Sequence, residues 1–272
     1  MGGSFLDTTI VVELVERTSA ADSWILPHLS SNAPVEMPEY ALRELLVGKV
    51  GLICDAHNRI MAADNPAQAL GSVMRLPAVR GRKRDVTALE IADALKASFD
   101  DPSPRSPAEI KREMLGWLAF RAAQMWSRGR KLSNVKTIQS LACFDAGNIK
   151  RGDSNELRGA NGSFNCNAGD RCAAARYIHG NTSELAAMIE ALHPTKLDAK
   201  AGNKAENASR RKALKQLDSD GPKNFNKRYC RALGDAYFAA MCPAGYSVVT
   251  TNTVDHEPLC KAAKKKVVGP PK

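Results

Sequence analysis

Short apolar runs and helical spacing predict an α/β fold at both ends of the chain. Residues 4–15 form an apolar, β-branched run that predicts a buried strand, and its later part could instead open a helix. Residues 37–47 place apolar side chains at helical spacing behind Pro38, which suits a first helical turn. A helical stretch over 229–240, a Pro/Gly break and the β-rich run 246–251 then predict a unit that feeds a parallel sheet.

The middle of the chain has a mostly helical pattern with clear interruptions. A proline-rich break over 100–107 precedes an amphipathic stripe that runs to about Arg128. Residues 145–171 are poor in apolar side chains and rich in Gly and Asn, which predicts a long loop. A further helix is expected from Thr182, and the polar segment 196–223 is expected to be an exposed helix or tether. The lysine-rich tail is expected to fray.

The charge balance points to a polyanionic partner. The 272 residues include 39 Lys and Arg against 29 Asp and Glu, for a formal net charge of +10. Each phosphate neutralised by such a protein releases counterions and adds affinity. Simple solubility is the alternative explanation, because net charge informs association rather than fold. Aromatic residues make up only 6%, which argues against a surface built mainly for stacking bases.

Two basic segments are the candidates for contacting phosphates. Both could also be ordinary exposed charge, which is the commoner meaning of such runs. The residues concerned are Arg80, Arg82, Lys83 and Arg84 in the first segment, and Arg210, Arg211 and Lys212 in the second.

Cysteine usage and hydropathy indicate a reduced, cytoplasmic protein. Seven cysteines are an odd number, and no secretory signal or apolar run of roughly 18 residues is present, so no membrane span is expected. Cys166, Cys172 and His179 suggest zinc only weakly, because their spacing departs from the usual one and no second cysteine pair follows. No glycine-rich phosphate loop or dinucleotide-binding turn occurs.

Acidic and amide side chains stand where elements of the expected sheet begin or end. Asp7 follows the first strand, where it could serve a ligand site or simply cap a helix. Glu44 lies at the edge of an apolar helix face, as a ligand or as a surface charge. Asp235 falls in a helix, and Asn252 and Asp255 follow the last expected strand. Clustered carboxylates attract Mg²⁺ or Mn²⁺, hard ions that prefer oxygen ligands.

Four short motifs, taken together, resemble the PIN domain. They are FLDTT, ALRELL, GDAYFAA and TTNTVD, and the last is the most specific. The resemblance implies a three-layer α/β/α core with a central parallel sheet and an acidic cluster that binds one or two divalent ions. It assigns Asp7, Glu44 and Asp235 as the first three acids, with Asn252 or Asp255 as the fourth position. His256 stands where the family more often has an aromatic residue, and no catalytic role is assigned to it.

The implied activity is a Mg²⁺- or Mn²⁺-dependent nuclease, favoured as an endoribonuclease, with a DNA nuclease as the alternative. Asp7, Glu44, Asp235 and Asp255 are its expected catalytic acids. The same motifs are compatible with a PIN-like protein that binds nucleic acid or a partner without cutting, and with the toxin of a two-protein system. A basic helical binder whose motifs are accidental is a weaker hypothesis. An inhibitory or effector protein partner and a homo-oligomer are also compatible with the implied activity.

The spacing of the motifs also predicts the domain organisation. Residues 1–74 and 226–272 are expected to form a discontinuous catalytic core, because they contain all four motifs. Residues 75–225 are then a long, mostly helical insertion, too large to belong to a compact domain of this kind.

Overall fold

The computed structural model describes residues 2–65, 68, 71, 73, 91–93, 105–132, 149–158, 172–197, 204–225 and 229–271. The chain divides into two compact units. The first comprises Met1–Leu42, Leu132–Asp145 and Phe164–Lys272, and the second comprises Arg43–Lys131 and Ala146–Ser163. These limits differ from the predicted boundaries at 74/75 and 225/226, because the helices between 172 and 225 belong with the sheet.

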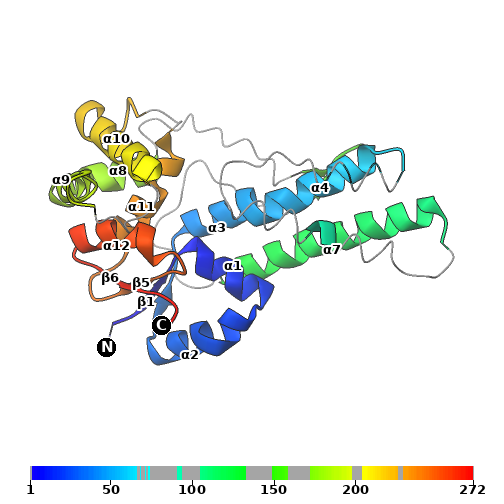
Figure 1. The fold of residues 1–272 in the computed structure, drawn as a ribbon, viewed down its shortest axis with the longest axis horizontal. Helices are drawn as coiled ribbons and strands as arrows, with labels where there is room; N and C mark the ends of the chain where they lie inside the picture. Colours follow the sequence, from blue (N-terminus) through cyan, green and yellow to red (C-terminus); the bar gives the residue numbers. More distant parts are fainter. Residues whose placement is uncertain are drawn as a thin grey trace. The chain divides into compact units, whose positions relative to one another are not determined.

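The first unit is built on a four-stranded parallel sheet. Its strands are β1 (Ser4–Leu6), β2 (Val35–Glu36), β5 (Ser247–Val249) and β6 (Lys266–Val268), in the order β2-β1-β5-β6 (Figure 1). Phe5 pairs with Val248, and both side chains are fully buried. Continuous burial along short apolar strands is typical of parallel sheets. The predicted α/β class with a parallel sheet is therefore confirmed.

The lysine-rich tail is ordered as an edge strand, so the expectation that it frays is wrong. Strand β6 pairs with β5 along its length, and the Thr250 amide donates to the Val268 carbonyl at 2.9 Å. The lysines before Val267 and Val268 obscure a short β-branched strand in the sequence. Lysines on an edge strand also discourage pairing with other chains.

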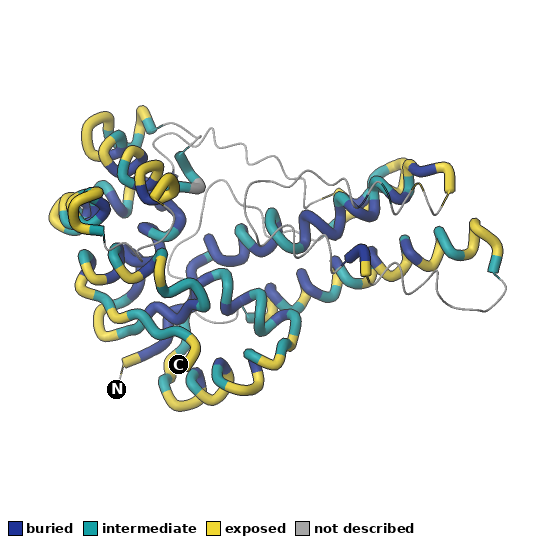
Figure 2. The backbone as a smooth tube through the Cα atoms, in the orientation of Figure 1, coloured by how far each residue is buried: buried dark blue, intermediate teal, exposed yellow. Residues whose placement is uncertain are grey.

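Nine helical segments lie wholly in the described part of the first unit. The N-terminal segment, which ends at Leu42, contains α1 (Thr8–Glu16), the π-helix η1 (Ala21–Ile25) and α2 (Leu26–Ser31). The others are α8 (Ala173–Gly180), α9 (Thr182–Ala191), α10 (Lys204–Asp220), the 3₁₀ turn η5 (Arg231–Leu233), α11 (Gly234–Met241) and α12 (Thr253–Ala262). Helix α11 contacts α12 and α8, while α10 contacts α8 and α9. Figure 2 shows β1 and α11 almost entirely buried, whereas α10 carries exposed residues along one side.

An aromatic cluster links α3 (Glu39–Leu45) to the sheet and to α11. Phe238 meets Phe5 edge-on with ring centroids 6.4 Å apart, and it meets Tyr40 at 5.8 Å. Tyr40 also contacts Tyr237 at 5.4 Å. Such pairs add to the free energy of burying the rings and fix the orientation of the helices that carry them. The cluster therefore holds α11 rigidly against β1.

The second unit is mainly helical. It contains η2 (Leu46–Val50), α4 (Gly51–Ala62), α7 (Pro107–Leu132) and a hairpin of β3 (Lys150–Arg151) and β4 (Leu157–Arg158). The Asn58 side chain binds the backbone of Leu157 twice, accepting from its amide at 2.8 Å and donating to its carbonyl at 3.2 Å. The predicted long loop over 145–171 thus contains a short hairpin that is tied to α4.

Helix α7 begins where the sequence predicts. Ser106 and Glu109 form a capping box, because the Ser106 amide donates to the Glu109 carboxylate at 2.8 Å and the Glu109 amide donates to Ser106 Oγ at 3.3 Å. The helix continues past the expected end at Arg128 to Leu132. Among the described residues, no helix has the length and apolar character needed to cross a membrane.

Candidate acidic site

Asp7 serves both as a helix cap and as a buried carboxylate at the end of β1. It is the N-cap of α1, and its Oδ2 accepts hydrogen bonds from the Thr9 hydroxyl at 2.7 Å and the Thr250 hydroxyl at 2.8 Å. Its own amide donates to the Val249 carbonyl at 3.0 Å. Only 3% of Asp7 is exposed. The capping role that the sequence left open for this residue is therefore observed, and it places the carboxylate at the end of the strand.

The polar residues after β5 form hydrogen bonds with one another and with the start of α1. The Thr251 amide donates to Thr9 Oγ1 at 3.0 Å, and the Asn252 amide donates to Thr250 Oγ1 at 2.9 Å. The Thr and Asn of the TTNTVD motif thus bind each other and the start of α1. Because β1 and β5 are parallel neighbours, their carboxyl ends lie at the same edge, where ligands bind in open α/β sheets.

Asp255 and Asn252 are bonded to each other. The Asn252 side-chain amide donates to Asp255 Oδ2 at 2.6 Å, while Asp255 Oδ1 accepts from Arg210 at 3.2 Å. The two candidates for the fourth position are therefore hydrogen-bonded to each other. Asp255 supplies the negative charge, and the Asn252 side chain orients the Asp255 carboxylate.

Arg210 brings three helices together at the site. Its guanidinium forms ion pairs with Asp235 of α11 and with Asp255 of α12, and it donates to Asn207 Oδ1 at 2.9 Å. Glu206 lies 3.9 Å away, one turn earlier on α10. Arg210 is only 8% exposed. It therefore lies inside the acidic cluster, and its predicted role in contacting phosphates remains a prediction.

His256 joins the two remaining acids. Its Nε2 lies 3.5 Å from a carboxylate oxygen of Asp7 and 3.5 Å from one of Asp235. The ring meets Phe238 edge-on at 5.8 Å and is buried. The sequence analysis gave this residue no role. Its position on the buried face of α12, with Leu259 and Cys260 one turn on, is the signal that could have identified it.

The pKa shifts follow from this pairing. Burial acts to raise the pKa of Asp7, but the charge of His256 and hydrogen bonds from His256, Thr9 and Thr250 lower it below its ordinary value. Burial acts to lower the pKa of His256, yet the charges of Asp7 and Asp235 hold it well above its usual value. Burial acts to raise the pKa of Asp255, but the hydrogen bond from Arg210 lowers it below its ordinary value.

The cluster holds more negative than positive charge. Asp7, Asp235 and Asp255 supply three carboxylates, against the cations of Arg210 and protonated His256. In the described part of the chain, no three His, Cys, Asp or Glu side chains are grouped so that they could hold a metal ion as they stand. The oxygen-only acids nevertheless suit a hard divalent ion, and the guanidinium already occupies the position of a cation between two of them. The three carboxylates are therefore ligands of the right type for such an ion, and Arg210 lies between two of them.

The remaining site residues from the sequence fall elsewhere. Glu44 is half-buried on α3 and belongs to the second unit, so its role as a ligand remains a prediction. The Arg211 side chain donates to the Ile189 carbonyl at 3.1 Å, and Lys212 is exposed. Residues 80–84, with their four basic side chains, lie outside the described residues, as does Cys166. Cys172 caps α8 by accepting from the Ala175 amide.

No protein-family model, curated protein or solved structure matches this chain. The resemblance to the PIN domain therefore remains a prediction from its four motifs.

Proposed function

We propose that the protein is a metal-dependent nuclease with a PIN-like, three-layer core, and that RNA is its substrate. The observation that carries the proposal is the convergence of Asp7, Asp235 and Asp255 from three separate elements at the carboxyl edge of a parallel sheet. Acids so far apart in sequence meet only because the fold brings them together. A cluster that must be neutralised by two buried cations is costly to build for stability alone.

The chain's own residues would prepare this site for a divalent ion. His256 and Arg210 keep the Asp7 and Asp255 carboxylates ionised, and hydrogen bonds from Thr9 and Thr250 to Asp7 and from Asn252 to Asp255 fix their positions. Asp7, Asp235 and Asp255 would hold Mg²⁺ or Mn²⁺. When bound, such an ion lowers the pKa of a water molecule and stabilises charge on the leaving oxygen.

Arg210 would have a second position in the active protein. If Asp235 and Asp255 held an ion, the Arg210 guanidinium would be available to a phosphate oxygen, which planar guanidinium groups bind well. Glu206 and Asn207, on the same helix, would remain beside it. His256 would continue to orient Asp7 and Asp235 from the buried side.

Cleavage of labelled single-stranded RNA and DNA in Mg²⁺, Mn²⁺ or EDTA tests the proposal. We expect metal-dependent cleavage of RNA that falls at least about a hundredfold in Asp235→Asn and in Asp7→Asn, since each removes a charged ligand. Asparagine is a good N-cap, so Asp7→Asn keeps the cap of α1, and circular dichroism checks that each variant is folded. Asp218→Asn, an exposed change on α10, is the matched control and should cleave like the wild type. Unchanged cleavage in Asp235→Asn would contradict the proposal.

A second candidate function is nucleic-acid binding without cleavage. It is favoured by one observation, the pairing of the acids with the cations of Arg210 and His256. In that case the same assay shows RNA retained by the protein but intact in every metal, and Asp235→Asn reduces stability rather than activity.

A further inference from the structure

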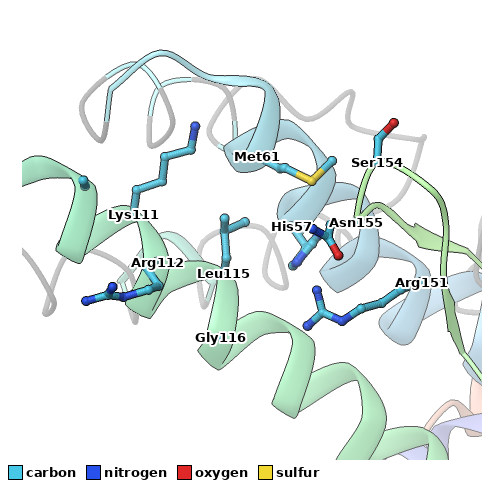
Figure 3. A pocket seen from close by; sticks show the side chains of 10 residues that line it. His57, Met61, Lys111, Arg112, Leu115, Gly116, Arg151, Ser154 and Asn155 are labelled. Atoms are coloured by element: carbon cyan, nitrogen blue, oxygen red, sulfur yellow. The ribbon is translucent and has the colours of Figure 1, made fainter.

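The second unit contains an open, basic cleft that none of the sequence motifs points to. It has a volume of about 490 Å³ and lies between α4, α7 and the turn of the β3–β4 hairpin (Figure 3). Such a volume is in the range of sites that hold a nucleotide-sized group. Its lining comprises His57, Met61, Ala108, Lys111, Arg112, Leu115, Gly116, Arg151, Ser154 and Asn155.

The lining includes three cationic side chains and no carboxylate. Lys111 and Arg112 come from α7, and Arg151 comes from β3. Figure 3 shows Arg151 extending from the hairpin toward α7, while Lys111 extends from α7 toward the end of α4. The Lys111 ammonium donates to the Ala63 carbonyl at that end, which fixes its position. The positive charge of the cleft thus comes from two elements on facing sides.

The acids nearest in sequence are engaged away from the cleft. Glu109 caps α7 through Ser106, and Glu113 pairs with Arg105. In the hairpin, Glu156 pairs with Arg158. In the described part of the chain neither Arg112 nor Arg151 forms an ion pair with a carboxylate, and Glu109 interacts with the charge of Arg112 only at longer range.

The hairpin turn carries a further acid and two small polar residues. Asp153 is exposed and does not line the cleft. Ser154 and Asn155 do line it, and both are exposed. They present an uncharged hydroxyl and amide beside Arg151, and such groups commonly accompany arginine in binding phosphate and sugar oxygens.

His57 adds an uncharged imidazole to the lining of the cleft. It is buried, and its Nδ1 lies 3.1 Å from Asn58 Oδ1. Burial and then the nearby charge of Arg151 lower its pKa, although the hydrogen bond to Asn58 opposes this. His57 is therefore neutral at pH 7, and the cleft's charge comes from Lys111, Arg112 and Arg151.

We propose that this cleft binds the phosphate backbone of a nucleic-acid strand. Unmatched cations from facing elements, uncharged polar groups beside them and a formal net charge of +10 suit a polyanion that spans more than one cation. The inference rests on the proposed function and extends it, because the acidic site would cut the strand while this cleft in the second unit holds it.

Fluorescence anisotropy of a labelled single-stranded RNA, with the full chain in EDTA, tests this proposal. EDTA prevents metal-dependent cleavage, so binding is measured even if the nuclease proposal fails. For Arg112→Gln with Arg151→Gln we expect the Kd to rise about tenfold at low salt. The slope of log association constant against log salt concentration should fall in magnitude by about 1.4, because each of the two lost phosphate contacts contributes about 0.7.

The matched control is Lys131→Gln with Lys150→Gln. It removes the same charge from exposed positions of the second unit that do not line the cleft. Its Kd should change less than about twofold, since only a nonlocal contribution of charge is lost. An equal loss in both double variants would contradict the proposal, because net charge alone would then explain binding.

A third variant changes the shape of the cleft and not its charge. Gly116 lines the cleft, and a Cβ added there meets no atom within 4 Å. Gly116→Leu should therefore fold, fill part of the cleft and weaken RNA binding. Wild-type affinity in this variant would argue against binding in the cleft. If a mononucleotide competes as strongly as the RNA, the cleft binds a single nucleotide rather than a strand, and the proposal is contradicted.

Discussion

At the scale of single residues, the charged groups of the acidic site depend on one another. Arg210 binds Asp235 and Asp255, and His256 lies between Asp7 and Asp235. Removing one member of such a buried network leaves its partners uncompensated, which typically costs about 3–5 kcal/mol.

His256 gives the stability of the metal-free protein a definite pH dependence. Its folded pKa is raised, so its protonated form stabilises the fold below the unfolded value of about 6.5, and this contribution is lost as the pH rises through the folded pKa. Urea unfolding in EDTA from pH 6 upward should show the wild type losing stability relative to His256→Gln. Parallel profiles for the two proteins would show that His256 is not charged in the folded state.

The sequence identifies some of these residues and not others, for physical reasons. Asp7, Asp235 and Asp255 stand next to elements with clear apolar patterns, so their meeting at one sheet edge could be predicted. Arg210 could not be placed, because α10 has few apolar residues and its sequence is typical of a solvated helix. Its position follows from the packing of α10 on α8 and α9, which no local pattern shows.

At the scale of elements, local signals are most reliable where side chains bind the backbone directly. The start of α7 is predicted from Ser106 and Glu109, since the capping box is a short-range interaction. Strands β2, β3, β4 and β6 are missed because, unlike β1 and β5, they do not lie in a longer apolar or β-branched run. Their formation depends on neighbours that are distant in sequence, as for β6 beside β5.

The cap of α7 can be tested on its own. Ser106→Ala removes the hydroxyl that accepts from the Glu109 amide and should lower the free energy of unfolding by about 1 kcal/mol in urea titrations. Ser127→Ala, an exposed change within the same helix, should be neutral or slightly stabilising, because alanine is the better helix former. An equal loss in both variants would mean that the cap contributes nothing specific.

At the scale of the whole molecule, clusters of opposite charge occur in different units. A chain with a net charge of +10 gathers three acids into one cluster in the first unit and three unmatched cations into a cleft in the second. The sequence predicts the basic character and the acidic motifs. It does not predict the cleft, whose cations come from α7 and from a hairpin inside the segment expected to be a loop.

The most direct test of the central claim is the position of an ion at the acidic cluster. We expect crystals grown with Mn²⁺ to show an anomalous diffraction peak bound by Asp7, Asp235 and Asp255, with Arg210 no longer bridging the last two. No peak at these acids at millimolar Mn²⁺, with Arg210 still paired to Asp235 and Asp255, would contradict the claim that they form a metal site.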